Sequence, residues 1–154
     1  MNKIFKQITV AVLAVTLIFG FTGCSTTAPN NATTMAAITV ATAIGAQTYI
    51  QSNPKTLPDF VVAEQALYTI STGTNDVTVN SVETALKANG GNVNPVVSIA
   101  IVDGINLADS YLQNSGTNSA AIKQVSFAVA TGLAQAVQSY STNATIQYKA
   151  ANKK

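Results

Sequence analysis

The chain begins with a continuous apolar run and then changes to apolar positions spaced three and four residues apart. Residues 8–19 form an uncharged run of 12 residues, preceded by Lys3 and Lys6. At a rise of ~1.5 Å per residue, this run is well short of the ~20 apolar residues that cross a bilayer. A positive start, a short apolar run and small residues after it are typical of a secretory signal peptide. We therefore expect the opening segment to direct export.

Residues 33–51 predict the first helix of the exported part. This segment contains no charged residue and is followed by Asn53-Pro54, where the residue before proline is disfavoured in the helical region. Alanine and threonine occur on every side of it, and a helix that is apolar all round is normally buried in a protein core or in lipid. Its apolar core from Met35 to Ile50 is too short for a comfortable membrane span. A central core helix is therefore favoured over a helix that lies against the membrane.

Four further helices are predicted from capping residues and apolar stripes. Threonine and asparagine favour helix N-caps, which places helix starts at Thr56, Thr78 and Asn94, and the last helix begins near Ser119. The stripes at helical spacing are Phe60, Ala63, Leu67 and Ile70; Val79, Val82 and Leu86; Val97, Ile101, Ile105, Ala108 and Leu112; and Ile122, Val125, Val129, Leu133, Ala136 and Tyr140. Five helices with short connections predict an all-α fold, a small antiparallel bundle.

Small residues recur four apart on three of these predicted helices. The sets are Ala41 and Gly45; Ala100, Gly104 and Ala108; and Ala128 and Gly132. Small residues at this spacing allow two helix backbones to approach closely, both in membrane dimers and in tight soluble bundles. In an alanine-rich exported chain, we expect them to serve core packing.

The only cysteine stands directly after the apolar run, in the sequence Phe21-Thr22-Gly23-Cys24. The last three residues are similar to the end of the bacterial lipobox, whose usual form is Leu, then Ala or Ser, then Gly or Ala, then Cys. Phe21 stands where Leu is usual. The resemblance implies a bacterial lipoprotein, with a diacylglycerol on the Cys24 thiol and signal cleavage after Gly23. The alternative, a small buried thiol, is not expected immediately after an export signal.

Lipidation would anchor the mature protein to a membrane without spanning it, since two or more acyl chains give stable residence at a bilayer. Ser25 follows the lipidated position, and the absence of an acid there is compatible with passage to the outer membrane in a host with two membranes. The partner implied is membrane lipid through acylated Cys24. The expected division is a signal peptide at 1–23, a tether at 24–32, the helical bundle at 33–141 and a polar basic tail at 142–154.

The tail carries three of the lysines close to its end. The favoured interpretation is a solvated helix end with frayed residues. The alternative is a basic handle for anionic lipid or a cell-wall polymer.

Composition excludes several kinds of chemistry. Residues 1–23 contain two of the eight lysines, so six lysines remain against six acidic residues, and there is no arginine. Without a basic stripe, we expect no nucleic-acid binding. The chain has no histidine, the commonest general base and metal ligand, and its one cysteine would be acylated. This excludes serine–histidine and cysteine–histidine nucleophiles and zinc sites built on nitrogen or sulfur ligands.

The acids are the remaining catalytic candidates, and their spacing argues against them. Asp103 and Asp109 are six residues apart, which places them about 240° apart around a helix, so they do not form a pair on one face. Glu64 could meet another acid only through the tertiary fold. The five tyrosines are expected at the rim of the core. We therefore expect no catalytic residue, no cofactor and no metal site, and we expect that the chain is not an enzyme.

The order of elements in residues 43–112 is similar to that of small all-helical phage and prophage proteins that have no assigned activity. The resemblance implies a mobile-element lipoprotein, with protection of the envelope against a second phage as one role. We expect a non-enzymatic, lipid-anchored module of the bacterial envelope that acts through protein contacts. The alternative is a binding module for a cell-wall or small-molecule ligand. An exposed apolar patch would favour the first function, and an enclosed cavity with polar groups would favour the second.

Overall fold

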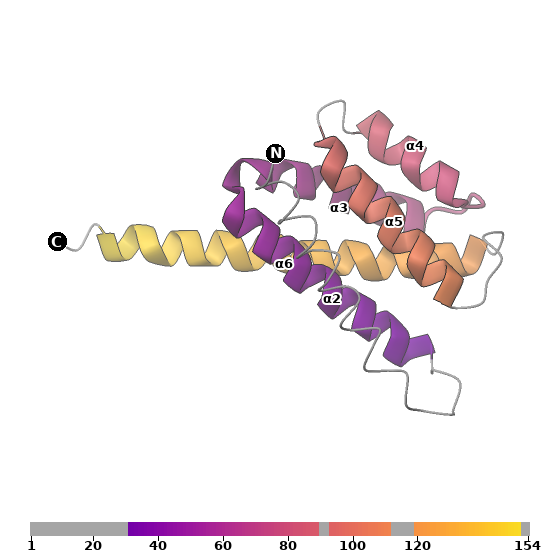
Figure 1. The fold of residues 1–154 in the computed structure, drawn as a ribbon, viewed down its shortest axis with the longest axis horizontal. Helices are drawn as coiled ribbons and strands as arrows, with labels where there is room; N and C mark the ends of the chain where they lie inside the picture. The colour runs from indigo at the N-terminus through magenta and orange to yellow at the C-terminus, as the bar shows by residue number, and fades with distance from the viewer. Residues whose placement is uncertain (1–30, 90–92, 112–118, 152–154) are drawn as a thin grey trace, which may run out of the picture.

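The computed structural model describes residues 31–89, 93–111 and 119–151. Within these ranges the chain forms five α-helices and one 3-10 turn and contains no β-strand, so the predicted all-α fold is confirmed. The elements are α2 (Asn31–Ser52), η1 (Pro54–Thr56), α3 (Leu57–Thr72), α4 (Val79–Asn89), α5 (Pro95–Tyr111) and α6 (Ser119–Ala151). Consecutive helices run in alternating directions, and the first and last therefore run the same way (Figure 1).

Two of the predicted N-caps are confirmed by their hydrogen bonds. The Ser81 N–H donates to Thr78 Oγ1 at 3.2 Å, and the Thr78 N–H donates to Ser81 Oγ at 2.7 Å, a reciprocal pair like a capping box. At the start of α5, the Val96 N–H donates to Asn94 Oδ1 at 2.9 Å. Pro95 occupies the first turn, where a backbone N–H would have no acceptor within the helix, so its absence in proline costs little. These contacts fix where α4 and α5 begin.

Thr56 precedes α3 as predicted, but its side chain does not cap that helix. Its hydroxyl donates instead to the Asn53 carbonyl oxygen at 2.7 Å, and Thr56 is buried. Pro54 at the start of η1 explains the difference, because proline fits the first position of a helical turn and leads the chain directly into α3. At the other end, α3 ends at Thr72, directly before Gly73.

The first and last helices extend beyond the limits of the predicted bundle at 33–141. α2 begins at Asn31, before the expected residue 33, and α6 continues to Ala151, into the tail for which a helix end is the favoured interpretation. Neither glycine nor proline interrupts residues 133–151, so the sequence offers nothing that would stop the helix there. In Figure 1 the last turns of α6 project beyond the other helices.

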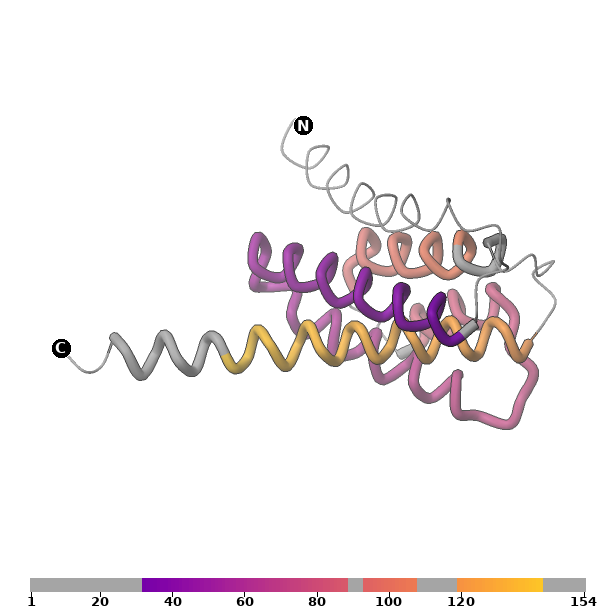
Figure 2. The backbone as a smooth tube through the Cα atoms, turned by 90° about the horizontal axis from the view of Figure 1, so that it is seen from below, coloured from indigo at the N-terminus to yellow at the C-terminus, as the bar shows by residue number. Residues whose placement is uncertain are grey.

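α6 is the central element of the bundle. It packs most extensively against α2 and α3, and Figure 2 shows α2 and α5 on one side of it and α3 on the other. Its buried residues cover more than half of its circumference: Ala121, Ile122, Val125, Ser126, Ala128, Val129, Ala130, Leu133 and Ala136. Burial of each large apolar side chain contributes ~1.5–3 kcal/mol. Every predicted stripe residue whose side chain is described is buried or half-buried.

α2 and α6 approach most closely at Gly132. A Cβ atom at this position would lie 2.5 Å from the Thr39 carbonyl oxygen and 2.7 Å from Thr42 Cβ, distances that real side chains do not adopt. Beside it, Thr39 Oγ1 lies 3.0 Å from the Met35 carbonyl oxygen and 3.2 Å from the Ala128 carbonyl oxygen. The hydroxyl proton is thus shared between its own helix and α6. The pair Ala128 and Gly132 therefore marks the helix contact that the small residues predict.

The predicted glycines Gly45 and Gly104 are not needed in this way. A Cβ atom at Gly45 or at Gly104 would meet nothing within 4 Å. Ala41 is buried in the core, whereas Ala100 is exposed. Of the three glycines among the predicted small residues, Gly132 is therefore the one that packing requires.

Replacing Gly132 by alanine tests this contact, with Gly45→Ala as the matched control. Alanine favours a helix over glycine by ~1 kcal/mol, but the added Cβ atom at position 132 meets rigid backbone, and overpacking costs ~1–3 kcal/mol. We expect Gly132→Ala to lower the free energy of unfolding in urea by ~1–2 kcal/mol and Gly45→Ala to raise it by ~0.5–1 kcal/mol. Equal stabilisation by both variants would show that α2 and α6 are not in close contact.

Candidate functional site

The predicted lipidation residue Cys24 and the predicted cleavage residue Gly23 lie outside the described residues. The first described residue, Asn31, is seven positions after Cys24 in the sequence. A fully extended chain spans at most ~3.3–3.6 Å per residue, so Asn31 lies within about 25 Å of Cys24. α2 is therefore the described helix that follows the predicted anchor most closely along the chain.

α2 is buried on one side only. Its buried residues are Thr34, Ile38, Ala41, Ala46 and Ile50, so α2 packs on the core along one side and is not the central core helix that the sequence predicts. On the opposite side, Val40 and Ile44 are 53% and 51% exposed and lie one turn apart. The helix has no charged residue, so the exposed side is uncharged, and it mixes apolar residues with threonine and glutamine. We define the α2 outer face as five of its exposed residues, Thr33, Ala36, Val40, Ile44 and Thr48.

A second pair of exposed apolar side chains joins α3 to α6. The rings of Tyr68 and Phe127 lie 6.1 Å apart between centroids at an angle of 39°, and the two residues are 51% and 47% exposed. Tyr68 therefore departs from the predicted position at the rim of the core. Tyr49 agrees with that prediction, because it packs partly buried against the core and its ring lies 5.9 Å from that of Phe60.

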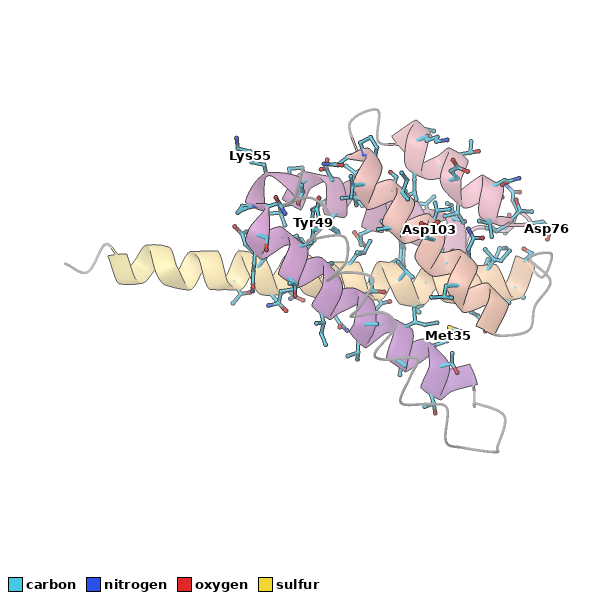
Figure 3. All side chains as sticks on the ribbon, in the orientation of Figure 1. Met35, Tyr49, Lys55, Asp76 and Asp103 are labelled. Atoms are coloured by element: carbon cyan, nitrogen blue, oxygen red, sulfur yellow. The ribbon has the colours of Figure 1, made fainter. Side chains whose placement is uncertain are left out.

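The charged residues of the described part do not converge on a common site. Figure 3 shows Lys55, Asp76 and Asp103 at separate places on the molecule. Lys87 and Glu83 form an ion pair at 2.6 Å within α4, where both side chains are exposed. Such surface pairs contribute ~0.3–0.5 kcal/mol to a helix and have no catalytic consequence. In the described ranges no group of three acids could hold a metal ion.

Lys123 lies on α6, and Asp103 and Asp109 lie on α5. Lys123 Nζ donates to the Gly73 carbonyl oxygen at 2.8 Å, so this lysine caps the end of α3 from α6. Asp103 is exposed, and the side chain of Asp109 lies outside the described residues.

A shallow depression lies where α2 meets α6. It has a volume of about 410 Å³, and its described lining consists of Gln47, Gln138, Ser139 and Thr142. These side chains are polar and uncharged, so they could bind a neutral polar group by hydrogen bonds alone. Thr142 already donates to the Gln138 carbonyl oxygen at 2.9 Å, which uses part of this capacity. The depression is open to solvent and would leave a small ligand largely exposed.

The composition of α6 raises the question of a membrane span. Among the described residues, Ser119–Thr142 is the one segment long and apolar enough to cross a membrane, and 56% of its most apolar window is buried inside the bundle. The core helix of a folded bundle meets the same criterion. Packing against α2 and α3 therefore accounts for the apolar composition of this segment.

Comparison of the chain with protein-family models, curated proteins and solved structures finds no match. The similarities to bacterial lipoproteins and to small helical phage proteins therefore stay predictions from sequence. Function has to be inferred from the anchor sequence and from the surface of the bundle.

One buried polar group stands out in the described core. Ser126 on α6 is fully buried, and its hydroxyl has no hydrogen-bond partner among the described residues. The described lining of the depression does not include it. A buried hydroxyl without a partner costs ~1–3 kcal/mol, so the sequence places a destabilising group in the centre of the bundle. Helical periodicity could not reveal this residue, since a serine beside an apolar stripe is normally exposed.

Ser126→Ala removes the unpaired hydroxyl and adds helix propensity. We expect the free energy of unfolding in urea to rise by ~1 kcal/mol. The control is Ser81→Ala, which removes the hydroxyl that accepts the Thr78 N–H and should lower stability by ~0.5–1 kcal/mol. A loss of stability in Ser126→Ala equal to that of the control would mean that the buried hydroxyl has a partner.

Proposed function

We propose that this chain is a lipid-anchored, non-enzymatic helical protein of the bacterial cell envelope that acts through contacts with other proteins. One observation carries the proposal: the first helix of the bundle begins seven positions after a cysteine that resembles a lipidation site. A connection of this length holds the folded part within about 25 Å of the acylated residue. The bundle would therefore act next to a lipid surface.

Exposed apolar side chains support a function based on contacts. Ile99 and Leu107 are single exposed apolar residues, which are normal on a protein surface. Two pairs also occur, Val40 with Ile44 and Tyr68 with Phe127. Tyr68 and Phe127 form a ring contact that is half exposed, and aromatic residues are enriched in protein interfaces. This pair is the favoured position for a protein partner. Residues 43–112 are similar to small phage proteins in the order of their elements. This similarity supports a prophage-related envelope function as one form of the proposed action through protein contacts.

A binding module for a cell-wall or small-molecule ligand is the second candidate function. The depression beside Gln47 and Gln138 supports it, since amide and hydroxyl groups suit neutral sugars. Sites for small ligands usually bury 70–90% of the ligand surface, which requires an enclosed cavity. The depression is open, so contacts with proteins are favoured.

The anchor is tested by growing cells with an alkyne fatty acid and comparing the wild type with Cys24→Ser. The wild type should take up the label and have residue 24 as its mature N-terminus, because the thiol is the acylated group. Cys24→Ser should lose the label, whereas Ser25→Ala, the matched control, should keep it. Equal labelling of the wild type and Cys24→Ser, or a mature N-terminus at another residue, would refute the anchor.

The contact is tested by placing a photoreactive amino acid at position 127 in cells. Phe127 is 47% exposed and lies in the aromatic pair, so we expect a discrete protein adduct after illumination. Gln135, which is exposed on the same helix, serves as the control position and should give none. Absence of an adduct at position 127, or the same adducts at both positions, would contradict a partner at the aromatic pair.

A further inference from the structure

We infer that the α2 outer face lies on the surface of the bilayer that holds Cys24. The inference deepens the proposed function and rests on the lipid anchor. Two observations carry it: the distribution of charge over the described helices, and the distance between the anchor and α2.

Charge separates α2 from the rest of the described bundle. The described charged side chains all lie outside α2, at Lys55, Asp59, Glu64, Asp76, Glu83, Lys87, Asp103 and Lys123. Moving a charged side chain toward the hydrocarbon boundary is costly, whereas alanine, valine and isoleucine carry no such cost. Thr48 Oγ1 donates to the Ile44 carbonyl oxygen at 2.8 Å, so this hydroxyl brings no unpaired donor to the surface. The stretch of the outer face from Ala36 to Thr48 is thus compatible with partial desolvation.

The anchor brings this face to the lipid. Asn31 follows Cys24 by seven positions, a reach of at most about 25 Å, and α2 with its 22 residues is itself ~33 Å long. A short tether gives the attached helix a high effective concentration at the membrane, so a weak preference for the surface is enough to orient it. Val40 and Ile44 supply that preference, because both are half exposed at the middle of α2.

A second copy of the chain is a less suitable partner for the α2 outer face than a lipid surface. A helix ~33 Å long and ~10 Å wide offers roughly 300 Å² on one side. Stable protein interfaces bury ~800 Å² on each partner. The α2 outer face alone therefore falls short of a dimer interface, whereas a lipid surface imposes no minimum area once the acyl chains supply the affinity.

A fluorescence experiment on the mature, lipid-modified protein tests the inference. The acylated Cys24 is the only cysteine, so a cysteine introduced by Ile44→Cys or by Thr84→Cys is the one free thiol for a polarity-sensitive fluorophore. Both positions are exposed, and they lie on α2 and α4, which occupy opposite edges of the bundle in Figure 1. The labelled proteins are reconstituted in vesicles of phosphatidylethanolamine and phosphatidylglycerol, with or without a lipid that carries a nitroxide quencher near its head group.

We expect the label at position 44 to shift its emission to shorter wavelength and to lose most of its intensity to the quencher. The label at position 84 should keep the emission that it has in water. Equal behaviour at both positions in protein that floats with the vesicles would overturn the inference while the anchor stands. Protein that is not acylated and does not float would overturn the anchor and the inference together. Absence of quenching at position 44, together with disulfide-linked dimers when the unlabelled Ile44→Cys protein is treated with an added thiol oxidant, would assign the face to a second copy.

Discussion

The fold depends on the contact between α2 and α6, the first and last helices of the described chain. Thr39 and Ala128, which share a hydrogen bond across it, are 89 positions apart in the sequence. The absence of a side chain at Gly132 sets how closely the two backbones approach, and the Thr39 hydroxyl sets their register. Because this contact joins distant segments, its formation carries the entropic cost of closing the chain across α3, α4 and α5. Gly132 thus controls how α2 packs on α6.

The sequence predicted the helices well because most of the signals are local. Thr78 and Asn94 cap their helices through hydrogen bonds to residues two or three positions away, and the stripe from Ile122 to Ala136 is buried as its spacing predicts. The burial of Ser126 and Ala130 was not predictable, because it arises from neighbours on several sides of α6. The apolar periodicity of one helix identifies one buried face, but it does not give the number of helices that pack against that helix.

The candidate site was predicted less well, for a related reason. A helix with alanine and threonine on every side has no pattern that tells its buried side from its exposed side, so the sequence left core and membrane as alternatives for α2. The structure assigns Ile38 and Ile50 to the core and leaves Val40 and Ile44 exposed. The contact of Tyr68 with Phe127 is equally invisible in the sequence, since the two residues are 59 positions apart and belong to different helices.

The proposed anchor explains why a weakly apolar exposed side of α2 would be sufficient at a membrane. Helices that bind membranes on their own need large apolar residues on one face and lysine or arginine on the other. Acyl chains on Cys24 would supply the affinity, so α2 needs only enough apolar surface to set the orientation of the bundle. Its two sides would then be independent: Thr39 holds α6 from one side, and Ile44 faces outward from the other. Changes at Ile44 should therefore alter orientation on the membrane without weakening the fold.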